Sequence, residues 1–555
     1  MMRKFAAILL ALALTFLVGC GAQTPNDPPN ENDSGQAQEG LALTNMAFEP
    51  ADAGGIEVHS FRLGTVDLTA ANNAIIRGPV DGMIAVPGGC CGEADCSPQA
   101  HPLVVLVHGA SPMAHANIHY PVHKGFDFLV QQLAAEGYVA LSINVNINYA
   151  FELGESLIQD GFALDTFDAH IAYLQRANAG ENVGHGVDLT NMIDFTQIHL
   201  IGHSRGGEVI ETFARRENNN IRSTLRVAST VSPRGAQPDI PLAVILPEYD
   251  GDVCQMEGQI VFDDVFTAAQ NQSFANIVYL RGANHNFFHR RFERDDRYGA
   301  RSLANPEDQS NWLSREEHER FLKRYAAAFL AVVTGQREPW GAFSALEPQP
   351  ATMFGFAVTA SSYTPGMQPL IAAPTQEHLA VNTSGSADVN FYLQSYPLAT
   401  IGHGLFNHPT AMNRQGGLPL YHLTWDDRDG AAEFPLLMED LSEGDAISLF
   451  VAMDSSDERN ARYDEQSFTV VLTDSHGAQQ SVLIPYGTSA LLVHPGELED
   501  AYEWGPFWIG WTPLGELRIP LGYFDEVDLS AVTQLTIRFD QTNVGAVMLA
   551  GGYLV

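Results

Sequence analysis

The sequence predicts an α/β fold with a mostly parallel sheet flanked by helices, followed by a region built only of strands. Up to about residue 340, short apolar runs alternate with helix-compatible segments, the pattern of a parallel sheet. From residue 343 onward, strand-like segments are separated by Gly, Asp and Asn turns. We therefore expect an α/β domain over residues 41–340 and a jelly-roll-like β-sandwich domain over residues 343–555.

The composition is that of a folded protein and argues against nucleic-acid binding. The chain has 555 residues, of which 45% are hydrophobic and 10% aromatic, enough for two large cores. It carries 29 basic and 66 acidic residues, a formal net charge of −37. Such a charge repels nucleic acids and anionic membrane surfaces and favours solubility in a salty or extracellular medium.

The N-terminus has the features of an export signal over residues 1–19. Arg3 and Lys4 precede an apolar segment, residues 5–18, that is too short to remain as a membrane-spanning helix. Leu17-Val18-Gly19-Cys20 resembles the lipobox of bacterial lipoproteins. This resemblance implies lipidation of Cys20 and attachment to a membrane through the lipid alone, and Gly21 suggests the outer membrane of a Gram-negative host. An ordinary secretory signal is the alternative, and residues 20–40 have the composition of a disordered tether.

Four further cysteines are candidates for disulfides in an exported chain: Cys90, Cys91, Cys96 and Cys254. Adjacent cysteines rarely bond each other, so Cys90 and Cys91 are expected to take separate partners. The pairing stays open. A zinc site is a weaker alternative because the spacing lacks paired Cys-x-x-Cys motifs.

The expected elements of the α/β region follow from their residue patterns. Antiparallel strands are expected within residues 41–90 and helices at 126–135, 160–177 and 315–333. Continuous apolar runs predict buried strands at 102–109, 138–145, 198–203, 225–231, 242–246 and 276–280.

One of these strands ends in Gly202-His203-Ser204-Arg205-Gly206, and a helix-compatible segment follows at once. Gly-X-Ser-X-Gly between a strand and a helix predicts a nucleophile elbow, a sharp turn that presents a reactive serine at the edge of the sheet. The N-terminus of the following helix favours negative charge there.

A reactive serine needs a base and an acid. After a nucleophile elbow, the acid (Asp or Glu) comes next along the chain, and the base, a His, follows it. Asp250 and His285 both come directly after apolar runs, so Ser204, Asp250 and His285 are the predicted triad. Asp252 and Glu248 remain alternatives for the acid, and His289 for the base. The backbone N–H groups of Arg205 and Ala110 are the expected oxyanion donors.

Four motifs together resemble exported bacterial α/β-hydrolases of the chlorophyllase, platelet-activating-factor acetylhydrolase and polyester hydrolase group. They lie between residues 75 and 335: His108-Gly109, Gly-His-Ser-Arg-Gly-Gly-Glu, Leu-Pro-x-x-Asp-Gly-Asp-Val and Gly-Ala-Asn-His-Asn-Phe-Phe. The resemblance implies an α/β-hydrolase fold and carboxylic ester hydrolysis through an acyl-enzyme, without a cofactor. It leaves the ester open.

The short path from Ser204 to Asp250 leaves no room for a large lid, which favours an open site for short-chain, aryl or polymeric esters. A lid could still come from residues 111–124 or 146–160. Two other functions stay open. One is amidase or peptidase chemistry by the same triad, and the other is a surface-binding lipoprotein whose β region holds a glycan or polymer. The second rests on a weak likeness of residues 516–540 to carbohydrate-binding modules.

Metal binding is expected to be absent or structural. His115, His119 and His123 have helical spacing, but Pro121 interrupts that helix and no carboxylate joins them, so a rim of solvated or substrate-facing histidines is expected. Two acidic clusters in the β region could hold calcium, although solvated turns are favoured. The clusters are Asp426-Asp427-Arg428-Asp429 and Asp454-Ser455-Ser456-Asp457-Glu458.

Overall fold

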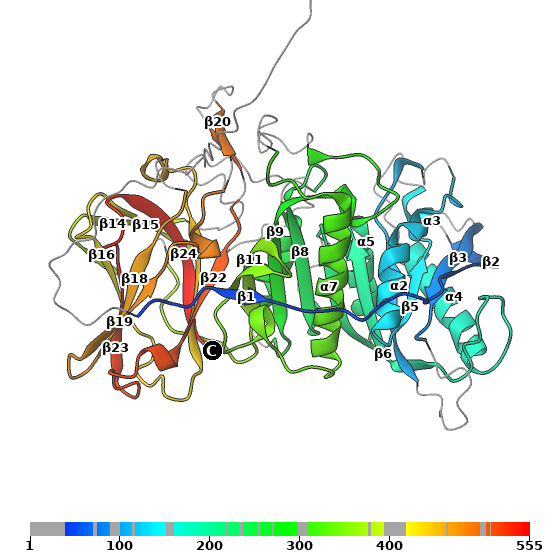
Figure 1. Ribbon diagram of the computed structural model, residues 1–555, viewed down its shortest axis with the longest axis horizontal. Helices are drawn as coiled ribbons and strands as arrows, with labels where there is room; N and C mark the ends of the chain where they lie inside the picture. Colours follow the sequence, from blue (N-terminus) through cyan, green and yellow to red (C-terminus); the bar gives the residue numbers. More distant parts are fainter. Residues whose placement is uncertain are drawn as a thin grey trace, which may run out of the picture. The chain divides into compact units, whose positions relative to one another are not determined.

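A large, mostly parallel sheet of eleven strands dominates the first part of the computed structural model (Figure 1). Its strand order is β1-β10-β11-β9-β8-β7-β6-β4-β5-β3-β2. The strands are β1 Thr44–Met46, β2 His59–Thr69, β3 Ile75–Ala85, β4 His101–Val107, β5 Val139–Ile143, β6 Ile193–His203, β7 Ile221–Val227, β8 Leu242–Tyr249, β9 Ala275–Asn284, β10 Pro350–Met353 and β11 Phe356–Tyr363.

The structure describes most of the chain from residue 39 onward. The described ranges are 39–69, 75–88, 100–113, 117–150, 160–217, 220–231, 237–253, 256–268, 271–297, 309–375, 379–392, 418–461, 464–494, 496–499, 507–510 and 512–555. Cys20, Cys90, Cys91, Cys96 and Cys254 lie outside them, so the lipid anchor and the disulfides stay predictions. Among the described residues, no helix combines the length and hydrophobicity needed to cross a bilayer.

The central strands are apolar on both faces because helices cover both. Strands β5, β4, β6, β7, β8 and β9 pair in parallel. Side chains alternate along a strand, so Val104 and Leu106 share one core with α2 (Asp127–Ala135) and α7 (Arg315–Val333). Leu103, Val105 and Val107 face the other core, with α4 (Asp160–Asn178) and α5 (Arg205–Ala214). The remaining helices are α3 Asn146–Ala150 and α6 Glu257–Thr267.

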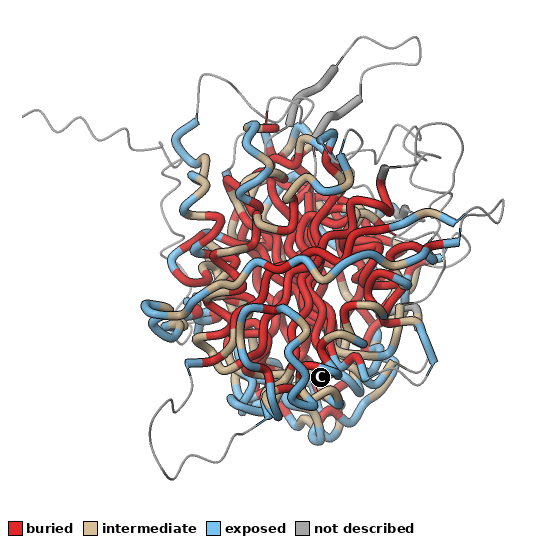
Figure 2. Tube along the Cα trace, turned by 90° about the vertical axis from the view of Figure 1, so that its right-hand side faces the viewer, coloured by how far each residue is buried: buried red, intermediate tan, exposed pale blue. Residues whose placement is uncertain are grey.

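Two antiparallel sheets follow and share one apolar core, which includes Tyr421, Phe434, Leu449 and Val470. Figure 2 shows buried segments in the interior and exposed ones at the periphery. One sheet has the order β14-β15-β24-β17-β22, with β12 paired to β24, and the other β13-β16-β23-β18-β19; β20 and β21 form a separate pair. The strands are β12 Gln368–Pro369, β13 Asn382–Ser384, β14 Ala387–Tyr392, β15 Leu420–Trp425, β16 Ala431–Pro435, β17 Ala446–Met453, β18 Phe468–Asp474, β19 Gln479–Ile484, β20 Gly496–Glu499, β21 Phe507–Gly510, β22 Gly515–Pro520, β23 Val532–Arg538 and β24 Gly545–Leu554.

The strands do not divide at residue 343 as the sequence analysis predicted. Strands β10 and β11 lie beyond that point but extend the large sheet, with β11 antiparallel to β9. The change in composition near Trp340 marks the end of the α-helices among the described residues. It does not mark a change of sheet, because an edge strand in the large sheet has the same residue pattern as a strand of a sandwich. The Oγ atoms of Thr359 and Ser361 donate to the carbonyls of Ser489 and Leu514, so the antiparallel region covers this edge. Residues 38–555 accordingly form one compact unit.

Candidate active site

Ser204 occupies a strained turn between a strand and a helix. Its φ of 55° lies in the left-handed region, β6 ends at His203, and α5 begins at Arg205. The backbone passes so closely here that a Cβ on Gly202 would lie 2.4 Å from the carbonyl oxygen of Gly206. A Cβ on Gly206 would lie 2.3 Å from the carbonyl oxygen of Val107 on the neighbouring strand. Both glycines of the motif are therefore required by sterics.

Asp250 and His285 form a hydrogen-bonded pair at the ends of strands β8 and β9. The Nδ1 atom of His285 lies 3.1 Å from Oδ2 of Asp250, and both residues are buried. The other oxygen of Asp250 accepts the backbone N–H groups of Asp252 at 3.0 Å and Val253 at 2.6 Å. These bonds fix the carboxylate and orient the imidazole.

The residue before the serine holds His285 in place. The Nε2 atom of His203 lies 2.8 Å from the backbone oxygen of His285, and the two rings are 4.8 Å apart between centroids. A carbonyl oxygen only accepts, so Nε2 of His203 carries the proton. Burial, together with the nearby His285, holds the pKa of His203 well below its usual range, so this imidazole stays neutral. The elbow and the strand end that carries the histidine are thus directly linked.

The pKa of His285 is set by burial opposed by three carboxylates. Burial alone lowers it, but Asp250, Asp252 and Asp296 together raise the pKa of His285 to about 9. Asp252 contributes from the solvent side, because its side chain is 70% exposed and its Oδ2 atom lies 3.6 Å from Nε2 of His285. The neutral form of His285 therefore predominates only at alkaline pH.

Asp296 is a site residue that the sequence analysis missed. Its buried carboxylate accepts the backbone N–H groups of Gly251 at 2.8 Å, His285 at 3.2 Å and Asn286 at 3.0 Å. It therefore joins the loop of the acid to the loop of the histidine. Its partners are backbone groups, so no motif marked it, and the charged run of residues 293–297 reads as a solvated loop.

The alternative acid and base take other places. Glu248 is buried within β8, accepts the backbone N–H of Gly282 at 2.7 Å, and lies 3.5 Å from Arg281. His289 packs between the rings of Phe126 and Phe292, each 4.5 Å away between centroids. The structure thus pairs Asp250 with His285 and keeps Glu248 and His289 in packing and structural contacts.

The loop after β4 lies directly against the serine. A Cβ on Gly109 would be 2.6 Å from Cβ of Ser204, so the backbone that leads to Ala110 passes close to the nucleophile. His108 fixes this loop through Nδ1, which lies 2.8 Å from the carbonyl oxygen of Gly109, and through Nε2, which accepts from Val145 at 3.1 Å. Burial lowers the pKa of His108 to about 4, so it stays neutral in this role. The N–H of Arg205 belongs to the first turn of α5, whose amides point toward the helix N-terminus.

The histidines at four-residue spacing do not form one face. His115 lies outside the described residues, whereas Nδ1 of His119 pairs with Asp81 at 3.2 Å. His123 is buried in the 3-10 helix η1 (Val122–Phe126), and the prediction of a solvated or substrate-facing rim is wrong for it. Packing of this helix against the sheet takes His123 out of solvent, as the Ser142 Oγ donates to the His123 carbonyl at 2.9 Å.

Together these groups have the parts that acyl transfer needs: a strained serine, an imidazole, a fixed carboxylate and backbone donors. No family model matches the chain, and no curated protein matches it significantly.

Proposed function

We propose that the chain has an α/β-hydrolase fold and is a serine carboxylic ester hydrolase that works through an acyl-enzyme. One observation carries the proposal. Ser204 lies on a left-handed turn at the end of β6, and His203 beside it is bonded to His285, which in turn is bonded to Asp250. The chain order of serine, acid and histidine is that of this fold.

In the proposed reaction, the neutral imidazole of His285 takes the proton of the Ser204 hydroxyl as the oxygen attacks the ester carbonyl. The carbonyl oxygen becomes an oxyanion, which the N–H groups of Ala110 and Arg205 stabilise. The imidazolium then protonates the leaving alcohol, and water activated by His285 hydrolyses the acyl-enzyme. Asp250 orients His285 and stabilises its charged form.

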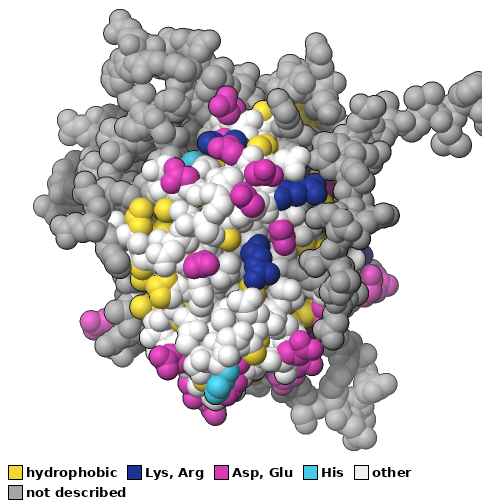
Figure 3. All heavy atoms as spheres, turned by 90° about the vertical axis from the view of Figure 1, so that its left-hand side faces the viewer, with side chains coloured by type: hydrophobic (Ala, Val, Ile, Leu, Met, Phe, Trp, Pro, Cys, Tyr) yellow, Lys and Arg dark blue, Asp and Glu magenta, His cyan; other side chains and the backbone are white. Residues whose placement is uncertain are grey.

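Extracellular short-chain, aryl or polymeric esters are the proposed substrates. Between the elbow and Asp250, the described residues form α5, β7 and β8 and no further helix that could cover the site. Acidic side chains are scattered over the face of the antiparallel region seen in Figure 3, with few basic ones, which disfavours anionic polymers.

Hydrolysis of p-nitrophenyl acetate and butyrate tests the proposal. Ser204→Ala removes the nucleophile and should abolish turnover, whereas Ser530→Ala, at an exposed serine of the β region, should leave it unchanged. Turnover by Ser204→Ala equal to that of the wild-type protein would contradict the assignment. A panel of aryl esters, polyester films and amides separates the esterase from an amidase or peptidase.

We also propose that the protein is exported and anchored by a lipid on Cys20, in the outer membrane of a Gram-negative host. The proposal rests on the lipobox-like sequence alone. Cys20→Ala should abolish labelling by radioactive palmitate and release the protein from the membrane fraction, and unchanged labelling would contradict it.

A further inference from the structure

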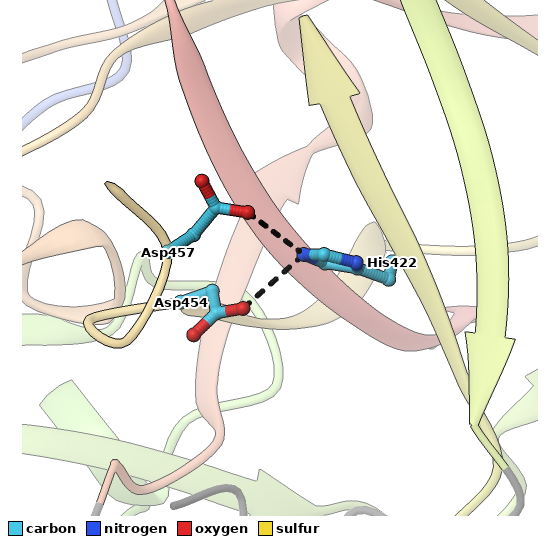
Figure 4. Close-up of side chains that lie close together, drawn as sticks. All are labelled: His422, Asp454 and Asp457. Carbon is cyan, nitrogen blue, oxygen red and sulfur yellow. Dashed lines mark ion pairs between the residues drawn. The ribbon is translucent and has the colours of Figure 1, made fainter. Parts of the chain in front are cut away.

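We propose that His422, Asp454 and Asp457 bind one divalent cation of the zinc class in the antiparallel region. His422 lies on β15, Asp454 directly follows β17, and Asp457 precedes the 3-10 helix η6 (Glu458–Asn460). The Nε2 atom of His422 lies 3.2 Å from Oδ2 of Asp454 and 3.9 Å from Oδ2 of Asp457. Figure 4 shows both carboxylates turned toward this nitrogen. One potential ligand atom from each residue lies within 4.8 Å of the others, and within the described ranges this is the one such group.

Neighbouring groups hold both carboxylates in this orientation. The Oδ1 atom of Asp454 accepts the backbone N–H of Ser456 at 3.0 Å and its hydroxyl at 2.6 Å, so Oδ2 is turned to His422. The Oδ1 atom of Asp457 accepts the backbone N–H of Arg459 at 2.9 Å, and its Oδ2 atom accepts from the Arg459 guanidinium at 3.1 Å while still facing His422. Hydrogen bonds that fix the second oxygen of a carboxylate are the usual support of a metal ligand.

The loop is also fixed to the sheet beneath it. The Nδ2 group of Asn460 donates to the carbonyls of Asp454 and Ala546, both at 2.7 Å. The three donors therefore come from a strand and from a loop that is already bound to β24. A preformed donor set loses less conformational entropy when a cation binds.

Burial and charge favour a cation at this point. The exposed fraction is 7% for His422 and 9% for Asp454, and burying a carboxylate is costly unless a positive charge compensates it. Asp454 and Asp457 lie here with Asp426, and Arg459 pairs with Asp457 and Asp426. Three carboxylates and one guanidinium leave two negative charges, which a divalent cation would neutralise.

The donor chemistry selects the metal. Imidazole nitrogen together with carboxylate oxygen suits zinc, whereas calcium takes six to eight oxygen ligands. Ligand atoms around tetrahedral zinc are about 3.4 Å apart, given bonds of about 2.1 Å. The separations of 3.2 and 3.9 Å fit this geometry after a small adjustment. Zinc is therefore the proposed metal, in place of the calcium that the sequence analysis considered for the acidic clusters. Water would complete its coordination.

The first acidic cluster has a different role, and the second is not the solvated turn that was favoured. Residues 426–429 form a turn held by Ser386, whose hydroxyl donates to the Asp427 carbonyl and whose N–H donates to Asp429. Asp454 is buried, because the loop folds back over β15 and β24. Only the cluster that meets His422 has the nitrogen donor that zinc prefers.

Titration of the metal-free full-length protein with Zn²⁺ alone tests the proposal by isothermal calorimetry and thermal unfolding. We expect one zinc ion per chain, a rise of the unfolding temperature, and its reversal by EDTA. Asp454→Asn and Asp457→Asn keep the side-chain shapes and should each weaken the affinity at least tenfold. Asp457, at the edge of the site, serves if the buried Asp454 variant does not fold.

Two matched variants control for other histidines and carboxylates. His476→Ala removes an exposed histidine of the same region, and Asp525→Asn removes an exposed carboxylate of that region that is outside the charge group of the site, so both should keep zinc affinity within about twofold. Zinc affinity that is unchanged in Asp457→Asn, or calcium binding in place of zinc, would overturn the proposal. Ester hydrolysis is not the readout, so the result is independent of the proposed function.

Discussion

Removing the exposed carboxylate of Asp252 should move the pH dependence of ester hydrolysis to lower pH. The Oδ2 atom of Asp252 lies 3.6 Å from Nε2 of His285 and helps to raise the pKa of that imidazole to about 9. Asp252→Asn deletes this charge, so the pKa of His285 falls. The neutral base then becomes available at lower pH.

The magnitude follows from the distance and the solvent. Two unit charges 3.6 Å apart in a medium as polar as water interact by about 1 kcal/mol, which is appropriate for a side chain that is 70% exposed. One pKa unit corresponds to about 1.4 kcal/mol. The rising limb of kcat/KM against pH should therefore shift down by about 0.7 of a pH unit.

The assay is hydrolysis of p-nitrophenyl butyrate between pH 6 and pH 10. Asp67→Asn is the control, because it removes an exposed carboxylate on the edge strand β2 and should leave the limb in place. A limb of Asp252→Asn that does not move, or that moves to higher pH, would refute this effect of Asp252 on the pKa of His285. Loss of all activity in Asp252→Asn would instead assign Asp252 the role given to Asp250.

Four further predictions test the surrounding geometry. Gly206→Ala places a Cβ against the Val107 carbonyl and should cost about 1–3 kcal/mol or more, seen as a lower unfolding temperature; unchanged stability would contradict the elbow geometry. Asp296→Asn should lower kcat at least tenfold with little change in KM, because the acid and histidine loops lose a shared acceptor; wild-type kinetics would show that the bridge is dispensable. His289→Ala should cost about 2–4 kcal/mol of stability but leave the pH limb in place, whereas a shifted limb would bring His289 into the chemistry. A fragment ending at residue 343 lacks β11 and exposes the edge of β9, so it should aggregate more than one ending at residue 367; equal solubility would contradict the observed boundary.

Much of the sheet could be predicted because buried parallel strands have a local signature. The continuous apolar runs at 102–109 and 138–145 are β4 and β5, and the helix predicted at 315–333 is α7, which begins at the Ser314 capping box. Strand β11 was assigned to the wrong sheet, since its pairing with β9 is set by contacts far away in the sequence. A residue pattern can identify a strand, but it does not identify the strand with which it pairs.

The residues of the candidate sites also divide into those that a local sequence pattern identifies and those that only long-range contacts identify. Ser204, Asp250 and His285 follow strand ends and turn residues, which a sequence displays directly. Asp296 contributes through three backbone N–H groups, and His422 meets Asp454 across separate strands. Such contacts produce no recognisable spacing of residues along the sequence, so only the three-dimensional structure identifies them.

Covalent labelling of Ser204 tests the central claim most directly. Incubation with a fluorophosphonate, followed by intact-mass and peptide mass spectrometry, measures whether one serine is activated. The proposed mechanism predicts a single adduct, located on Ser204, that is absent from Ser204→Ala and strongly slowed in His285→Ala. A folded protein that takes up no adduct, or takes it up on another residue, would contradict the assignment of Ser204 as the nucleophile.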